Sequence, residues 1–185
     1  MRSLRVKLAA AVAVVGVGAV GAVAIAHDRS TFGGFLSGYQ EVPAVSTGAS
    51  GTFRAAINRS EDSIAWELTY TKLESAVQQA HIHLGQKSVN GGIMVFLCSN
   101  LPNPPAGTQN CPPPPARISG TITPAQVTGI QPAGTNPQGL DPGEFDELVR
   151  AMRAGVTYAN VHSARSPGGE IRTQIVRAKD HYAAG

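Results

Sequence analysis

Short apolar runs alternate with stretches rich in Gly, Ser, Asn and Pro over residues 31–123. This spacing is typical of a domain built from short β-strands. The clearest strand is predicted over residues 63–70, where apolar side chains recur at every second position. Such side chains share one face of a strand, so this face is expected to point into the core. The four apolar residues are Ile64, Trp66, Leu68 and Tyr70.

The same pattern predicts further strands before and after this one. They lie over residues 51–58, 79–84, 93–98, 117–122, 156–162 and 169–176. Asn90-Gly91 supplies turn residues that tolerate positive φ, and is expected to join the second and third of these strands as a pair. Residues 99–115 are too rich in proline for a strand interior and predict a loop.

One helix is predicted in this otherwise β-like chain. Asp141 is suited to cap it, Pro142 suits its first position, Glu144 completes a capping-box pattern, and Gly155 is placed to end it. Apolar residues follow at the helical spacing i, i+3, i+4, i+7 and are expected to pack on the strands. They are Phe145, Leu148, Val149 and Met152. The predicted fold is all-β: an antiparallel, Greek-key-like β-sandwich with one short covering α-helix.

The N-terminal segment has the features of a secretory signal peptide. Arg2, Arg5 and Lys7 precede a run of Ala, Val, Gly, Leu and Ile that closes on Ala24-Ile25-Ala26, a small-x-small cleavage site. We therefore predict a leader over residues 1–26 and one domain over residues 27–185. The alternative is an uncleaved membrane anchor, since roughly 19 apolar residues are enough to cross a bilayer. The protein is expected to be secreted or extracytoplasmic, with no membrane span in the mature chain.

Removing the leader changes the charge of the chain. The whole chain carries a net charge of +3, and the leader contains three basic and no acidic residues, so the mature chain is formally neutral. There is also no basic run with interleaved aromatic residues. The sequence therefore does not predict a nucleic-acid partner.

The two cysteines, Cys98 and Cys111, are close in sequence and even in number. An exported chain meets an oxidising environment, so we predict a disulfide between them at the base of the proline-rich loop. The alternative, a thiolate metal site, has little support because the chain has no second cysteine pair and no histidine lies between the two.

Three histidines carry the candidate chemistry. Alternation along a strand puts His81 and His83 on the face opposite Ala80 and Ile82, and His162 lies on a later strand. Imidazole nitrogens held in this way suit copper or zinc. The alternative is that the rings lie on the outer face of the sandwich and only form structural hydrogen bonds.

Two further residues are expected to support these rings. Asn160 shares a strand face with His162, and Glu170 follows a predicted turn at residues 167–169. Either side chain is suited to orient an imidazole by a hydrogen bond. Alternatively, Glu170 and Arg172, which share a strand face, form an ionic cluster on the outer surface.

Seven short motifs follow one another along the chain, at residues 35–45, 51–53, 68–70, 80–85, 90–91, 160–162 and 169–172. Together they resemble the CHRD (chordin) domain family, in family order over about residues 32–177. This resemblance implies an extracellular β-sandwich, found alone in exported bacterial proteins, with no activity established for the family at large. The His-x-His pair followed by a later His is also similar to copper-zinc superoxide dismutase, but no bridging His or metal-ligating Asp is evident.

We therefore expect a non-enzymatic binding or structural module that ligates one metal ion and has an unknown extracellular or cell-envelope partner. The alternative is a copper- or zinc-dependent redox or metal-handling protein with a dismutase-like histidine site on its outer face. No catalytic residue is predicted, because the chain has no Gly-x-Ser-x-Gly elbow and its cysteines are expected to be paired.

Overall fold

The computed structural model describes residues 31–131 and 138–178. The predicted leader lies outside these residues. No helix of the described part is long and apolar enough to cross a membrane. The strands are β1 (Thr31–Ser37), β2 (Ser50–Ile57), β3 (Ile64–Thr71), β4 (Val77–Leu84), β5 (Ile93–Ser99), β6 (Ala116–Ile122), β7 (Thr157–Ser163), β8 (Ile171–Gln174) and β9 (Val176–Arg177). The helices are α1 (Phe145–Arg153) and the short 3-10 turns η1 (Gly38–Gln40) and η2 (Pro124–Gln126).

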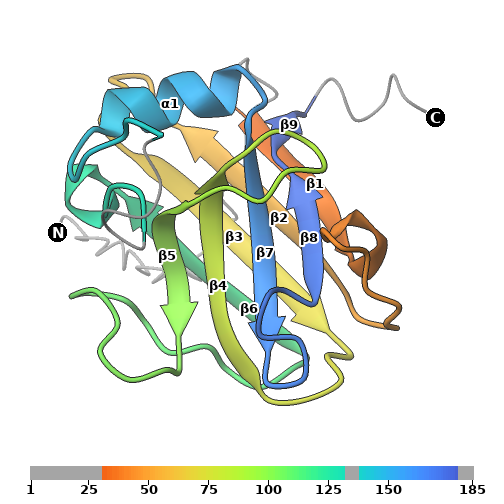
Figure 1. The fold of residues 1–185 in the computed structure, drawn as a ribbon. Helices are drawn as coiled ribbons and strands as arrows, with labels where there is room; N and C mark the ends of the chain where they lie inside the picture. The colour runs from red at the N-terminus through yellow and green to blue at the C-terminus, as the bar shows by residue number, and fades with distance from the viewer. Residues whose placement is uncertain (1–30, 132–137, 179–185) are drawn as a thin grey trace, which may run out of the picture.

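The strands form one antiparallel sheet in the order β5-β4-β7-β8-β1-β2-β3-β6, with β9 paired to β1. The sheet bends round into a nearly closed barrel, with β5, β4, β7 and β8 in front and β1, β2, β3 and β6 behind (Figure 1). The predicted all-β class is confirmed. Because the strands are hydrogen-bonded along one continuous path, the architecture is closer to a single bent sheet than to a sandwich of two separate sheets.

The core fills the space between the two halves of this sheet. The predicted inner face of β3 is confirmed, since Ile64 and Leu68 are fully buried and Trp66 and Tyr70 nearly so. These side chains share one hydrophobic cluster with residues from the opposite half, including Ile82 of β4. Every second side chain of β3 therefore points inward, as the pleat of a strand requires.

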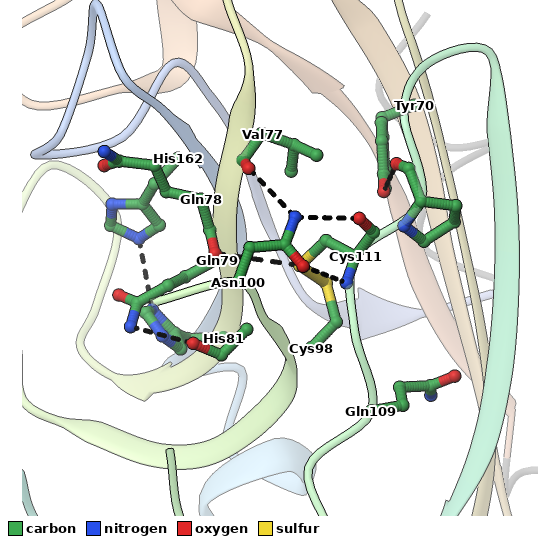
Figure 2. The surroundings of a disulfide bond; sticks show 12 residues. Tyr70, Val77, Gln78, Gln79, His81, Cys98, Asn100, Gln109, Cys111 and His162 are labelled. Atoms are coloured by element: carbon green, nitrogen blue, oxygen red, sulfur yellow. Dashed lines mark hydrogen bonds between the residues drawn. A yellow bond between two sulfur atoms is a disulfide. The ribbon is translucent and has the colours of Figure 1, made fainter. Parts of the chain in front are cut away.

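The disulfide Cys98–Cys111 is present, as predicted. It connects the end of β5 to the loop that leads to β6. These two strands are the edges of the sheet (Figure 1). Asn100 also holds the loop at the disulfide. Its side chain donates to the carbonyls of Val77 and Cys111 and accepts from the Cys111 amide (Figure 2).

The helix begins later than predicted. Its first residue is Phe145, and the Asp141 side chain does not cap it. One bond of the predicted capping-box pattern is present, since the Glu144 side chain accepts from the Asp141 amide at 2.9 Å. The reason is tertiary: Pro142 pairs with Thr128, and the Gly143 amide donates to the Val127 carbonyl, which holds residues 141–143 in a turn outside the helix. The helix lies across one end of the barrel (Figure 1). The predicted apolar stripe is confirmed as buried: Phe145, Leu148, Val149 and Met152.

Candidate metal centre

The three predicted histidines lie together on one face of the sheet. His81 and His83 come from β4, and His162 comes from the neighbouring antiparallel strand β7. Asn160 lies directly opposite His81 in this pairing. Adjacent residues of a strand point to opposite faces, so these side chains lie on the far side of β4 from Ala80, which pairs with Cys98 and faces the core. Figure 2 shows His81 and His162 on one side of β4 and the disulfide on the other.

The pairing of β4 with β5 is irregular beside the histidines. The register shifts once between Ala80 and His81 and again between Ile82 and His83. Such irregularities bend a strand and redirect its side chains, and they are frequent beside functional sites. In this sheet they bring Phe96 opposite His81, where the two rings meet edge to face with centroids 4.5 Å apart.

The three rings are buried, on the face of the sheet that points away from the hydrophobic core. His81, His83 and His162 are 1%, 7% and 8% exposed. The covering groups come from other parts of the chain, namely Phe96, the backbone at Gly91 and the turn at Pro167. The rings therefore lie on the outer face of the sheet, and neighbouring segments close over them.

One ring nitrogen from each histidine lies within 4.8 Å of the others. The shortest separation joins His81 Nδ1 and His162 Nε2, at 3.1 Å. The triad could therefore hold a metal ion, since ligand nitrogens bind zinc or copper at about 2.0–2.1 Å and so lie a few ångströms apart.

Backbone carbonyls select the tautomers of two of these rings. His83 Nδ1 lies 3.0 Å from the Gly91 carbonyl oxygen, and His162 Nδ1 lies 2.9 Å from that of Pro167. A carbonyl only accepts, so both Nδ1 atoms carry the hydrogen. In the neutral rings both Nε2 atoms are then left with a lone pair, which is the form that binds a metal.

Burial keeps the rings neutral. Desolvation lowers the pKa of His83 to about 3, despite opposing hydrogen bonds from the rest of the site. Desolvation also lowers the pKa of His81 and of His162, and the two neighbouring histidines lower that of His81 further. Because metal ions compete with protons for these nitrogens, low pKa values favour metal binding near neutral pH.

Asn160 contacts two of the three rings. Its Oδ1 lies 3.0 Å from His83 Nε2 and 3.0 Å from His162 Nε2. The side chain is 2% exposed. It was predicted to support the histidines, and the structure places it between them.

The expectation for Glu170 is corrected. Its carboxyl is fully buried and accepts hydrogen bonds from the Thr47 hydroxyl at 2.8 Å and the Glu74 amide at 2.9 Å. These bonds connect Glu170 to the chain segments before β2 and β4, and none reaches an imidazole. Gly169, at φ 124°, turns the backbone just before Glu170, so the side-chain direction predicted from strand alternation does not apply.

The outer-surface cluster of Glu170 and Arg172 is also wrong. Arg172 is buried and donates to Asn90 and to the Val89 carbonyl. Its guanidinium lies 3.4 Å from the ring centroid of Tyr158, and its nearby acidic group is Glu41.

Sequence reasoning missed Glu41 and Tyr158 as parts of the site. Tyr158 stacks on His83, and the Glu41 carboxyl lies near the Asn160 amide, beside Gly169. Glu41 is 6% exposed, and burial raises its pKa to about 7 against the opposing effect of Arg172. The one signal that pointed to Glu41 was its place within residues 35–45, one of the segments that carry the family resemblance.

The family model of the CHRD domain matches residues 32–175, which include every described strand except β9 and the first residue of β1. Searches of curated proteins and of solved structures find no match. The match includes all three histidines, Asn160 and Glu41, and it extends over most of the chain. The chain therefore belongs to the CHRD domain family.

Proposed function

We propose that this chain is an exported CHRD-domain protein that binds one copper or zinc ion through His81, His83 and His162 and works as a non-enzymatic binding module. The observation that carries the proposal is the convergence of three buried imidazoles from two strands, with one ring nitrogen of each within 4.8 Å of the others. Imidazole nitrogen is a preferred ligand of both metals.

Structural hydrogen bonding alone accounts poorly for this arrangement. Nδ1 of His83 and Nδ1 of His162 already donate to carbonyls, so their Nε2 lone pairs require donors from elsewhere. A single hydrogen on His81 Nδ1 satisfies at most one of them. Buried polar groups without partners are costly, and a bound cation would satisfy several nitrogens together.

The closure of the site favours metal binding over catalysis. A catalytic metal keeps a coordination position open to substrate, whereas a structural or storage site is closed. The three ligands are no more than 8% exposed, and Phe96 packs against His81. This supports a holding role over the alternative of a dismutase-like redox enzyme.

Export is part of the proposal. The disulfide suits an oxidising compartment, and residues 1–26 have the pattern of a cleaved leader. Mass spectrometry of the protein recovered from the export fraction of expressing cells tests this. We expect a mature chain that starts at His27; an intact N-terminus held in the membrane fraction would support the anchor instead.

Metal content tests the site itself. The exported protein is incubated with Cu²⁺ or Zn²⁺, desalted and analysed for metal by mass spectrometry. We expect about one equivalent in the wild type and a loss of tight binding in His83→Ala, because two remaining imidazoles bind weakly. His181→Ala is the matched control, since the proposal does not use that histidine. Uptake that is equal in all three proteins would exclude these ligands.

A further inference from the structure

We infer that the amide oxygen of Asn160 is a fourth ligand of the metal held by the histidine triad, and that Glu41 is the positioning residue that turns this oxygen toward the metal. The inference rests on the proposed function and adds an oxygen donor to it. The complete set is three imidazole nitrogens and one amide oxygen, which suits Cu²⁺.

Three hydrogen-bond acceptors meet at Asn160. Its Oδ1 lies 3.0 Å from Nε2 of His83 and 3.0 Å from Nε2 of His162. Both Nε2 atoms carry lone pairs, because the hydrogens of these rings lie on the Nδ1 atoms that face carbonyl oxygens. No hydrogen is then available between the amide oxygen and His83. Three lone pairs this close repel one another unless a cation lies between them.

The Asn160 amide must also be oriented with its oxygen toward the imidazoles. The oxygen and nitrogen of an asparagine side chain are nearly interchangeable in shape, so a neighbour must choose between them. Glu41 provides that choice, because its buried Oε1 has no hydrogen-bond partner among the described residues and lies near the Asn160 amide, beside Gly169. A carboxylate only accepts, so it selects the amide NH₂ group. The oxygen is then turned to the opposite side, toward the two imidazoles.

Gly169 shows how closely these two groups approach. A Cβ atom at this position would lie 2.4 Å from Glu41 Oε1 and 2.9 Å from Asn160 Nδ2. The carboxyl oxygen and the amide nitrogen therefore border the same small space beside a residue that lacks a side chain. The NH₂ end of Asn160 therefore lies on the Glu41 side, where a carboxylate attracts it.

The donor spacing indicates which metal fits. Consecutive donor atoms in the series His83 Nε2, Asn160 Oδ1, His162 Nε2 and His81 Nδ1 are 3.0, 3.0 and 3.1 Å apart. Ligands bound at about 2.0–2.1 Å lie about 2.9 Å apart in a square-planar site and about 3.4 Å apart in a tetrahedral site. The observed spacing is closer to the square arrangement. Mixed nitrogen and oxygen donors in that geometry favour Cu²⁺ over Zn²⁺.

The test compares Cu²⁺ affinity, by chelator competition, and electron paramagnetic resonance spectra in the full exported protein. Asn160→Leu removes the oxygen at similar size, and Asn160→Asp keeps one. We expect Asn160→Leu to weaken binding about 100-fold or more and to change the copper spectrum, and Asn160→Asp to retain tight binding. Glu41→Ala should weaken binding about 10–100-fold, whereas Glu41→Gln, which keeps an acceptor oxygen, should restore most of the affinity and the wild-type spectrum.

The outcomes separate the two proposals. If the wild type binds no copper, or binds it equally after His83→Ala, the proposed function fails. If His83→Ala abolishes binding while Asn160→Leu keeps the wild-type affinity and spectrum, only the amide ligand is overturned. Should Asn160→Leu not fold, as judged by circular dichroism, the unaltered chain is labelled with ¹³C at its asparagine amides. Pulsed resonance should then detect a coupled amide carbon, and its absence would overturn the assignment.

Discussion

The imidazole of His83 lies parallel to the phenol ring of Tyr158, with ring centroids 4.5 Å apart and an interplanar angle of 4°. The Arg172 guanidinium lies 3.4 Å from the centroid of the same phenol ring. One ring face has room for one of these groups, so Tyr158 lies between a candidate ligand and a buried cation. Stacking fixes the plane of His83, and the charge of Arg172 helps to keep that imidazole unprotonated.

Two replacements of Tyr158 should separate the contribution of the stacked ring to stability from that of the hydroxyl. Tyr158→Phe keeps the ring and loses contacts of the hydroxyl with the Gly91 backbone at 3.3 and 3.4 Å, so we expect a loss of about 1 kcal/mol in the free energy of unfolding. Tyr158→Leu also removes the ring from between His83 and Arg172, and should cost about 2–4 kcal/mol. Urea unfolding measures both. Equal losses in the two variants would show that the stacked ring contributes little.

Stability without metal should fall in acid. The pKa of His83 is about 3 in the folded protein against an ordinary value of 6.5, and the pKa values of His81 and His162 are lowered too. Below pH 6.5 the unfolded chain therefore binds more protons at these residues than the folded chain, which favours unfolding. Each such proton contributes about 1.4 kcal/mol per pH unit.

Glu41 opposes this trend. Its pKa is raised from 4.5 to about 7, so between these values the folded chain binds the extra proton and gains stability as the pH falls. Three histidines against one carboxyl leave a net loss between pH 6.5 and 4.5. Chelator-treated protein should show it in urea unfolding at several pH values. Glu41→Gln should steepen the slope and His162→Gln should reduce it; a flat profile in the wild type would contradict the burial of neutral imidazoles.

Gly169 should tolerate no side chain. It has a φ of 124°, and a Cβ there would lie 2.4 Å from Glu41 Oε1. Gly169→Ala should therefore lower the free energy of unfolding by about 1–3 kcal/mol and displace Glu41 and Asn160, with weaker copper binding as a result. Gly168→Ala is the matched control, since nothing lies within 4 Å of a Cβ at that neighbouring position. Similar thermal unfolding of the two variants would count against the crowding.

The disulfide should stabilise the fold without contributing to the metal site. Cys98 and Cys111 are 13 residues apart, and a loop of that length is expected to contribute about 3 kcal/mol. Reduction, or the double replacement Cys98→Ala with Cys111→Ala, should lower stability by about this amount, as urea unfolding will measure. Copper binding below the unfolding transition should be unchanged, because Ala80, which pairs with Cys98, faces away from the histidines. A loss of binding in the folded double variant would show that the two faces of β4 are coupled.

The sequence alone determined which residues share a face and where the chain must turn. Alternation along the chain predicted which side chains of β3 face inward. It also predicted that His81 shares a strand face with His83, and His162 with Asn160, because the pleat of a strand is a local property. The cysteine pair and the proline-rich loop were equally local signals.

Only the tertiary structure decided what covers the histidines and what faces them. Burial of the rings comes from Phe96, Gly91 and Pro167, and Glu41 lies near Asn160 although more than a hundred residues of chain separate them. The helix start was misplaced for the same reason, since residues 141–143 are held by a segment that no local pattern connects to them. Periodicity reports the direction of a side chain relative to its own strand, whereas its protonation, its partners and its exposure depend on which distant segments fold against it.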